Sequence, residues 1–318
     1  MSLLVSIVGP LVLSLIAEDP APVPSAATLE GHSHAVLCAA VSPDGGTIVT
    51  GSEEPTVRVF DAREHTLTKS LEGNDGNVTA LAFSADGTTL AVGDYYKKVR
   101  LWETKSWTLQ RTLEVGGVVT ALVFSADAKT LYVADKDNAV RVFDLGAAED
   151  AKPRVLQHAF EVTALALTRD GSTLLTGDGF GTLTAWDLKT SEKTWWRTQG
   201  AQIEALALLD SDKVVACASI GTPFAAFDVI EGEKIGRFHA GELEPSALTT
   251  SLDGKLIYAG TREGPIHVLE SSTGKNVRTI DGHTSIVTGL TRTADGNTLI
   301  STSRDATVRL SSIAPAKR

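Results

Sequence analysis

The stretch that decides the fold is residues 71–112, LEGNDGNVTALAFSADGTTLAVGDYYKKVRLWETKSWTLQRT. The same pattern starts again at Leu113-Glu114, and most of the chain consists of further copies of this unit. Copies aligned on a short Asp-containing turn lie about 42 residues apart, a period typical of repeat architectures. The seven turns are SPDG (42–45), SADG (84–87), SADA (125–128), TRDG (168–171), LDSD (209–212), SLDG (251–254) and TADG (293–296).

Alternating apolar and polar residues predict four strands within the unit. They cover residues 78–83, 89–93, 98–102 and 108–113. Asp-Gly between the first two strands is a strong hairpin signal. The fourth strand is polar, which suits an exposed outer edge. Each repeat is therefore predicted to form a four-stranded antiparallel sheet.

The first strand of every copy has a small residue at its third position, followed by a mostly apolar one. The small residues are Cys38, Ala80, Ala121, Ala164, Ala205, Ala247 and Gly289. The residues after them are Ala39, Leu81, Leu122, Leu165, Leu206, Leu248 and Leu290. Inner strands that converge on one axis need such small residues, whereas a linear stack does not. We therefore predict an all-β fold, a closed seven-bladed β-propeller of four-stranded antiparallel blades, with Ala and Leu lining its channel.

The two ends of the repeat region predict how the ring closes. The last copy ends soon after its third strand, TVRLSS at 307–312. Residues 26–30, before the first copy, resemble a fourth strand. We therefore expect this N-terminal strand to complete the last blade, which removes an open sheet edge.

The start of the chain differs from the repeats. Residues 3–17 form an apolar run that as a helix would reach about 22 Å, short of the roughly 30 Å hydrocarbon core of a bilayer. We expect residues 1–17 to be a signal peptide, 18–25 a Pro-rich linker and 26–318 the propeller. This predicts export to the periplasm or the extracellular space. Alternatives are an uncleaved membrane anchor at 3–17, a wrongly assigned start, or a disordered tail.

Composition narrows the class of partner. The net charge is −10, and the absence of a basic stripe argues against nucleic acid. Cys38 and Cys217 lie in different repeats, so a disulfide between them is not expected.

Several dipeptides resemble those of the WD-repeat family, seven-bladed propellers similar to G-protein β subunits. A Gly-His pair stands at Gly31-His32 and at Gly282-His283. The dipeptide at the end of the third strand reads Phe60-Asp61, Trp102-Glu103, Phe143-Asp144, Trp186-Asp187 and Phe227-Asp228, and decays to Leu269-Glu270 and Ser311-Ser312. The resemblance covers residues 26–318.

The resemblance implies a buried hydrogen-bonded set of His, Ser or Thr, Asp and Trp in a blade. By position, the last repeat retains His283, Ser303 and Asp305, with Ser311 where Trp is usual. The first repeat retains His32 and Ser52, with Glu54 and Phe60 in the other two roles. We find no repeat with all four, so we expect blades held mainly by apolar packing. Buried polar groups left over should find water or backbone partners.

Residues suited to catalysis are sparse. His32 and His34 lack a third metal ligand nearby, and the repeated aspartates each occupy a separate turn, where Asp stabilises the backbone. We see no nucleophile elbow and no phosphate-binding glycine loop. We therefore predict no enzymatic activity, no metal and no cofactor.

The resemblance implies that partners bind the narrower face, through residues before the first strand and in the loops between the second and third strands. By position, the first set is Ala35, Asn77, Val118, Glu161, Gln202, Glu244 and Ile286, and the second is Glu53, Tyr95, Lys136, Gly179, Ile220, Arg262 and Arg304. Aromatic and Arg side chains dominate interface energetics. The predicted partner-binding residues are Tyr95, Tyr96, Phe180, Arg262, Arg304, Glu161 and Glu244. The alternative is that these are ordinary solvated loops.

Trp195-Trp196 lies on the fourth strand of the fourth blade. Adjacent strand residues face opposite ways, so both could pack against flanking blades, or one could be exposed for a lateral contact. The leading hypothesis is a non-enzymatic scaffold that binds a protein or peptide, as a monomeric propeller within a complex. Alternatives are an enzyme or small-ligand sensor that uses the channel, and a structural subunit of a larger exported assembly.

Overall fold

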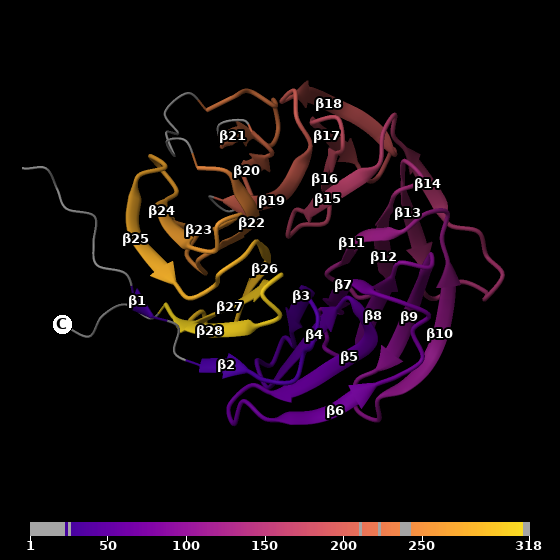
Figure 1. Ribbon diagram of the computed structural model, residues 1–318. Coiled ribbons are helices and arrows are strands. Elements are labelled where there is room, and N and C mark those ends of the chain that lie inside the picture. Colours follow the sequence, from indigo (N-terminus) through magenta and orange to yellow (C-terminus); the bar gives the residue numbers. More distant parts are fainter. Residues whose placement is uncertain (1–22, 25–26, 210–211, 222–223, 236–242, 314–318) are drawn as a thin grey trace, which may run out of the picture.

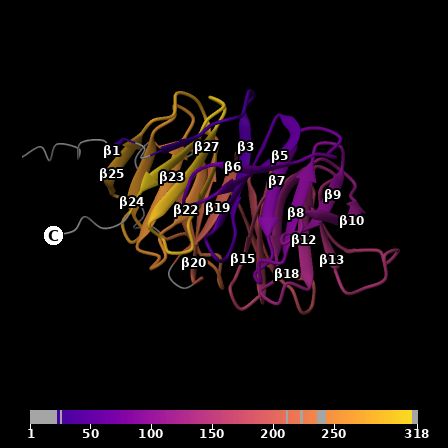
Figure 2. The ribbon, with the colours of Figure 1, turned by 90° about the horizontal axis from the view of Figure 1, so that it is seen from below.

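The fold is a ring of seven β-sheets around a central axis, and in the described residues it contains no helix (Figure 1). The computed structural model describes residues 23–24, 27–209, 212–221, 224–235 and 243–313. The expected signal peptide and, apart from residues 23–24, the linker lie outside this part. Turned by 90°, the ring is a disc of strands that is wider than it is tall (Figure 2).

Each of the first four blades is an antiparallel sheet of four strands in sequence order. Blade 1 contains β3 (Val36–Val41), β4 (Thr47–Ser52), β5 (Glu54–Asp61) and β6 (Leu67–Leu71), and blade 2 contains β7 (Val78–Phe83), β8 (Thr89–Asp94), β9 (Lys98–Glu103) and β10 (Thr108–Glu114). Blade 3 contains β11 (Val119–Phe124), β12 (Thr130–Asp135), β13 (Ala139–Asp144) and β14 (Arg154–Gln157), and blade 4 contains β15 (Val162–Leu167), β16 (Thr173–Asp178), β17 (Thr182–Asp187) and β18 (Glu192–Thr198). The four strands predicted for blade 2 are thus confirmed.

The last three blades are less uniform. Within the described residues, blade 5 shows β19 (Ile203–Leu209), β20 (Val214–Ser219) and β21 (Ala225–Asp228), with one bridge from Phe227 to Lys234. Blade 6 contains β22 (Pro245–Thr250), β23 (Leu256–Thr261), β24 (Ile266–Glu270) and β25 (Asn276–Asp281), and β1 (Val23–Pro24) pairs with β25 in parallel. Blade 7 contains β26 (Val287–Arg292), β27 (Thr298–Ser303) and β28 (Val308–Ser312).

The ring closes as the sequence predicted. β2 (Ala27–Leu29) pairs with β28 in antiparallel orientation and supplies the fourth strand of blade 7. Leu29 is buried with residues of blades 7 and 1, including Ile300 and Phe60. Residues from the two ends of the chain therefore share one core, which fastens the ring by apolar packing. Cys38 and Cys217 are both free thiols.

The repeated Asp turns fold through local hydrogen bonds. In blade 2, the Asp86 carboxylate accepts from the Ser84 hydroxyl (2.6 Å) and from the Thr88 amide (3.0 Å), while Gly87 adopts a φ of 71°. The Ser84 hydroxyl and the Thr88 amide lower the pKa of Asp86, with its partial burial opposing them. These aspartates therefore hold hairpins between the two inner strands of their blades, the role predicted for them.

Neighbouring blades pack through very close contacts. Each of seven apolar clusters contains residues of two adjacent blades. On β8, Gly93 lies so near Val119 of blade 3 that an added Cβ would stand 2.4 Å from its Cγ1. Gly51, Gly177 and Gly260 approach the neighbouring blade in the same way at three other seams, that is, boundaries between adjacent blades. Glycine at this position lets the inner parts of the blades meet.

Candidate functional site

The candidate site is a depression of about 480 Å³ at the mouth of the central channel, lined by residues from all seven blades. It gathers both positional sets that the sequence analysis singled out. From the strand starts come Asn77, Val118, Glu161, Gln202 and Ile286, and from the loops come Glu53, Tyr95, Lys136, Arg262 and Arg304. Residues far apart in the sequence are thus brought to one place.

Four of the seven predicted partner-binding residues line this depression: Tyr95, Glu161, Arg262 and Arg304. Tyr96, Phe180 and Glu244 do not line it but are exposed. Tyr96 packs edge-on against Tyr95, with ring centroids 5.8 Å apart. The structure therefore places the predicted set partly in the channel mouth and partly around it.

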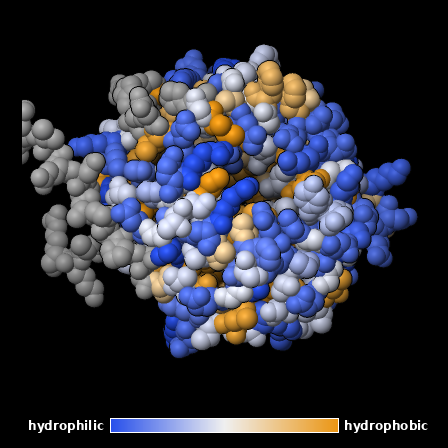
Figure 3. Space-filling model, viewed as in Figure 1, coloured by the Kyte–Doolittle hydropathy of each residue, from blue (hydrophilic) through white to orange (hydrophobic). Residues whose placement is uncertain are grey.

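A second aromatic pair lies on blade 4. Phe180 stacks on Phe160 with ring centroids 4.6 Å apart, and both rings are substantially exposed. Phe160 was not singled out in the sequence, because it precedes β15 by two residues and has no aromatic counterpart in most repeats. Seen along the ring axis, the surface is mostly hydrophilic, with separate small hydrophobic patches (Figure 3). Exposed aromatic pairs of this kind are suited to contact a partner.

Charged side chains form pairs across the blades that line the mouth. Lys136 of blade 3 lies 3.5 Å from Glu161 of blade 4. Arg262 of blade 6 donates to Glu204 of blade 5. Burial raises the pKa of the Glu204 carboxyl, an effect that the nearby Arg262 opposes. The second carboxylate oxygen of Glu204 is buried without a partner in the described structure, so this pair retains unused hydrogen-bonding capacity.

Two charged groups at the mouth have no ion pair among the described residues. Glu53 of blade 1 and Arg304 of blade 7 occupy equivalent loops of adjacent blades, and both are exposed. Because neither has a charge within ion-pair distance among the described residues, they can meet charges of a partner without first breaking such a pair. This gives the mouth a cationic and an anionic contact point beside each other.

At its mouth, the channel is lined not by the expected Ala and Leu residues but by the residues just before the small ones, namely Leu37, Thr79, Thr120, Thr163, Glu204, Ser246 and Thr288. In every inner strand the pairing shifts by one residue here, as in β7 between Val78 and Ala80. Such a bulge breaks the alternation of side chains, so the intervening residue turns toward the axis.

Several of these hydroxyls connect one blade to the next. Thr120 donates to the Val162 carbonyl (2.5 Å), and Thr163 donates to that of Ile203 (2.6 Å). Ser246 bonds blade 6 to blade 7, and the bond from Thr288 to the Val36 carbonyl (2.6 Å) closes the ring. The residue pattern Thr/Ser before a small residue was present in the sequence and could have indicated this ring.

The hydrogen-bonded sets around His32 and His283 differ from the expected ones. In blade 1, His32 bonds Thr50 (2.7 Å), and in blade 7, His283 bonds Ser301 (2.8 Å) and Asp305 (2.9 Å). The hydroxyl partners are thus two residues before the expected Ser52 and Ser303. Ser52 instead donates to Glu54 (3.1 Å), and Ser303 donates to the Ser285 carbonyl (3.2 Å). Positions two apart face the same side of a strand, so the sequence alone could not separate them.

Blade 4 contains the set that the sequence analysis did not find in any repeat. His158 bonds Thr176 (2.8 Å), and the Trp186 indole donates to the same hydroxyl (3.2 Å). Asp178 anchors the adjacent loop by accepting from the amides of Phe180 and Thr182. His158 was missed because no glycine precedes it. All four residue types therefore occur in blade 4, although Asp178 bonds the loop rather than the histidine.

Burial keeps these histidines neutral. Desolvation lowers the pKa of His158 to about 4, and desolvation together with Arg58 lowers that of His32 to about 4. Burial also opposes ionisation of Asp305, but bonds from Thr307, the Thr284 amide and His283 lower its pKa to about 2. The sets are structural, because each lies within a blade and away from the channel mouth.

Blades 2 and 3 use a different buried set. In blade 2, Arg100 bonds both Asp94 and Asp75, and Asp94 is fully buried. In blade 3, Arg141 makes the equivalent bond to Asp135 and a second one to Asp137 of the loop between β12 and β13. The arginine in the third strand was not singled out in the sequence analysis, although Val-Arg recurs there in four repeats.

Of the two alternatives for the Trp pair on β18, the structure shows the one in which a single Trp is exposed. Trp195 is buried and donates to the Val229 carbonyl of blade 5 (2.8 Å), whereas Trp196 is 61% exposed.

Within the described residues, no helix could span a membrane, and no cluster of three His, Cys, Asp or Glu side chains could hold a metal.

Comparison with known proteins agrees with this architecture. The family model described as WD domain, G-beta repeat matches residues 24–61, 65–103, 107–144 and 274–310. The matched segments cover blades 1, 2, 3 and 7 and the β25 strand of blade 6. Seven blades of this construction, together with these matches, define the class of protein: the chain belongs to the WD-repeat family of β-propellers.

A short segment is also similar to SEC12-like protein 2 of Arabidopsis thaliana. The two are 39% identical over 69 residues, which is 21% of this chain and 18% of that protein. The match therefore spans less than a fifth of the relative's length. Propellers of the WD-repeat family typically serve as protein-interaction scaffolds.

Proposed function

We propose that this chain is a non-enzymatic scaffold that binds a protein or peptide at the mouth of its central channel. The observation that carries the proposal is the convergence of Tyr95, Glu161, Arg262 and Arg304 from four blades on one depression of about 480 Å³. Tyr95, Arg262 and Arg304 stand at the same loop position of their repeats, and Glu161 stands at a strand start. The residues at both positions differ from blade to blade. Such variation on a constant scaffold is how repeat proteins acquire specificity.

The chemistry of the mouth favours a polypeptide partner. Exposed aromatic rings at Tyr95 and Tyr96 supply apolar contact area, and Arg304 and Glu53 supply unpaired charges of both signs. The net charge of −10 disfavours nucleic acid. The remaining predicted residues, Phe180 and Glu244, would extend the contact outward. The propeller is proposed to act as a monomer within a complex, without a cofactor.

Affinity capture from the native cell tests this site. The full chain, its Tyr95→Ala and Arg304→Ala variants and a Lys105→Glu control on an outer turn are used as baits, and captured proteins are quantified by mass spectrometry. A specific partner should be depleted at least tenfold by each mouth variant and retained by the control. Equal capture by all four baits would refute the channel mouth as the binding site.

We further propose that the chain is exported to the periplasm or extracellular space. Support comes from the apolar run at 3–17 followed by a Pro-rich segment. The alternative is a protein anchored in the membrane by residues 3–17. The intact mass of the native protein decides: export with cleavage removes about the first 17 residues or more, whereas an anchor leaves them in place and the protein in the membrane fraction.

A small-ligand sensor in the channel is the second candidate. It is favoured by the polar lining, in which Glu204 and Arg262 form a partly unsatisfied pair beside a ring of hydroxyls. A thermal-shift screen of metabolites on the purified protein tests it. Stabilisation that is lost on Glu204→Gln would support this candidate over the polypeptide scaffold.

A further inference from the structure

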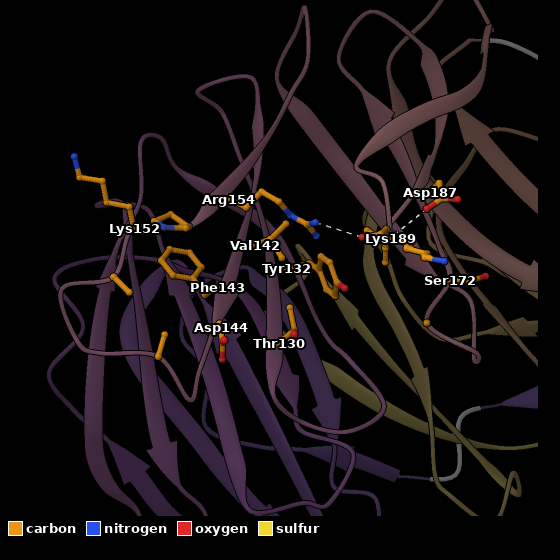
Figure 4. Close-up of a pocket in the computed structure, with 15 residues that line it drawn as sticks. Thr130, Tyr132, Val142, Phe143, Asp144, Lys152, Arg154, Ser172, Asp187 and Lys189 are labelled. Carbon is orange, nitrogen blue, oxygen red and sulfur yellow. Dashed lines mark hydrogen bonds between the residues drawn. The ribbon is translucent and has the colours of Figure 1, made fainter.

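Besides the channel mouth, a groove of about 720 Å³ lies between blades 3 and 4 (Figure 4). It exists because the connection at residues 145–153 is longer than in blades 2 and 4, which leaves the last two residues of β13 without a partner in β14. Its charged lining is mixed, since Arg154 and Lys189 donate hydrogen bonds whereas Asp144 and Asp187 accept them. Such a lining selects neither donors nor acceptors, and in this respect the channel mouth is different.

The bulged positions of the seven inner strands form a ring inside the channel mouth, which we call the collar. Five positions carry a hydroxyl, and the other two hold Leu37 and Glu204. The hydroxyl residues are Thr79, Thr120, Thr163, Ser246 and Thr288. All seven collar residues are half-buried. The collar lies two residues further along each inner strand than the strand-start residues of the mouth, so a partner would reach it with an inserted side chain.

Each hydroxyl of the collar already uses its only proton on a backbone carbonyl. Thr79 donates to the Gly93 carbonyl of its own blade (3.2 Å). The other four donate to carbonyls of the next blade, at 2.5 to 2.7 Å. Because a hydroxyl has one donor and two acceptor lone pairs, these oxygens can only accept from a group in the channel. The Glu204 carboxylate, which accepts from Arg262, is no donor either.

A ring that only accepts hydrogen bonds selects groups that only donate them. A carboxylate or a carbonyl would remain unpaired there, and so would the oxygen of a side-chain amide. Lys, Arg and Trp side chains donate without accepting, and of these only Lys and Arg have several donors, enough to bond hydroxyls of neighbouring blades at once. This selection comes from hydrogen bonding and not from net charge, because three Glu and three basic residues line the mouth.

Within the collar, blades 2 to 4 suit a Lys or Arg side chain best. Hydroxyls stand in three consecutive blades there, and the exposed ring of Tyr95 lines the same depression. The face of an aromatic ring attracts a cation. The one basic residue of this sector that lines the mouth, Lys136, lies 3.5 Å from Glu161. Blades 6 and 7 instead contribute Arg262 and Arg304, which would repel a second cation.

We infer that the partner segment inserts a Lys or Arg side chain into the channel mouth, an inference that rests on the scaffold function proposed above. The N–H groups of this side chain donate to the hydroxyls of Thr79, Thr120 and Thr163, and the rest of the segment lies on the rim of the mouth. The partner is thereby defined as a polypeptide with an accessible basic side chain. The hydroxyls of the collar then have a second role besides joining the blades.

Peptide pools test the inference on the full chain. Five pools of nine-residue peptides share one random mixture, free of Lys and Arg, at the outer positions and differ only in the central residue, which is Lys, Arg, Gln, Glu or Leu. Each pool is passed over the immobilised protein, and the retained peptides are quantified by mass spectrometry. We expect the Lys or the Arg pool to be retained at least tenfold more than the other three. The best peptide is then labelled with fluorescein, and its Kd is measured by fluorescence anisotropy.

Matched variants locate the binding. Thr79→Val removes a collar hydroxyl that does not join two blades, so it should weaken the best peptide by roughly tenfold, the usual effect of losing one hydrogen bond to a charged group. Thr79→Ser keeps the hydroxyl and should bind within twofold of the wild type. The control Thr68→Val removes a hydroxyl that donates to the Val59 carbonyl on the outer strand of blade 1, and it should also bind within twofold. Far-ultraviolet circular dichroism verifies that each variant is folded.

Three results would overturn the inference: retention of the Gln, Glu or Leu pool to the same extent as the Lys and Arg pools, retention of no pool, or a folded Thr79→Val variant that binds the best peptide as the wild type does. The scaffold function fails separately, because its test is the capture of a native partner by baits altered at Tyr95 and Arg304. A partner captured in that way but indifferent to Thr79→Val would leave the scaffold standing and remove only the inserted basic side chain.

Discussion

Replacing Thr176 by Val should destabilise the protein more than any loss of volume can explain. The Thr176 hydroxyl is completely buried in blade 4 and lies between His158 and Trp186. His158 Nδ1 faces the Leu156 carbonyl at 3.1 Å, and since a carbonyl only accepts, this nitrogen carries the proton. His158 Nε2 therefore accepts from the Thr176 hydroxyl, and the Trp186 indole N–H donates to the oxygen of the same hydroxyl.

Valine keeps the shape of threonine but removes both of these bonds. The substitution leaves two buried polar groups without partners, the His158 Nε2 and the Trp186 indole N–H. At about 1–3 kcal/mol for each unsatisfied group, the expected cost is about 2–6 kcal/mol. At about 1.6 °C per kcal/mol for a domain of this size, the melting temperature should fall by at least roughly 3 °C.

Two further variants isolate the cause. Thr176→Ser keeps the hydroxyl and loses one buried methyl, so it should cost only about 0.8 kcal/mol. Blade 2 carries the natural counterpart, because Val92 occupies the same position and the buried Trp102 indole has no partner in the described structure. Val92→Thr should therefore stabilise the protein, by up to about 1 kcal/mol.

Urea and thermal unfolding followed by far-ultraviolet circular dichroism measure all three variants, so that the signal does not depend on the environment of one Trp. From most to least stable, we expect the order Val92→Thr, then wild type, then Thr176→Ser, then Thr176→Val. If Thr176→Val is as stable as Thr176→Ser, the hydroxyl carries no net stabilisation and the argument is refuted.

Three other perturbations have defined outcomes. His32 and His158 have pKa values of about 4 in the folded protein, below their ordinary value of 6.5. As the pH drops from 6.5 to 4, protons therefore bind the unfolded chain first, and the free energy of unfolding should fall by roughly 3 kcal/mol for each histidine. A urea midpoint that rises over this pH range would contradict this expectation. Gly93→Ala, which places a Cβ 2.4 Å from Val119, should cost about 1–3 kcal/mol in urea unfolding, and no loss would show that the seam can open freely. Asp94→Ala deprives the buried Arg100 of one partner and should cost about 3–5 kcal/mol in the same assay, whereas a loss below 1 kcal/mol would show that Asp75 alone suffices.

The fold could be predicted from the sequence because its signals are local and recur. A hairpin turn with Asp, Gly and a Ser or Thr is decided within about six residues, and seven copies fix the period. The strands predicted at 89–93 and 98–102 differ from β8 and β9 by one residue each. Closure by β2 was predictable for the same reason, since the last copy lacked a fourth strand.

The lining of the channel mouth could not be predicted from alternation alone. A bulge in each inner strand turns the residue at its second position toward the axis, for example Thr79 between Val78 and Ala80. A bulge depends on how two strands meet rather than on one strand's pattern. The groove between blades 3 and 4 was missed for a related reason: the sequence shows a long connection at 145–153 but not which edge it leaves open.

The bulged position also limits where specificity can arise. In blades 3, 4, 6 and 7 its hydroxyl bonds the next blade, as Thr288 bonds Val36, so replacing it there would weaken the ring. In blade 1 the seam bond comes from the neighbouring Cys38, which leaves Leu37 free to vary, and in blade 5 the position holds Glu204. The Glu204 carboxylate faces the channel and accepts a hydrogen bond from Arg262 of blade 6. Arg262 and Arg304 lie in adjacent blades, and Arg304 has no ion pair among the described residues. The sector from blade 5 to blade 1 should therefore discriminate among partners by charge, while blades 2 and 4 contribute the exposed aromatic rings.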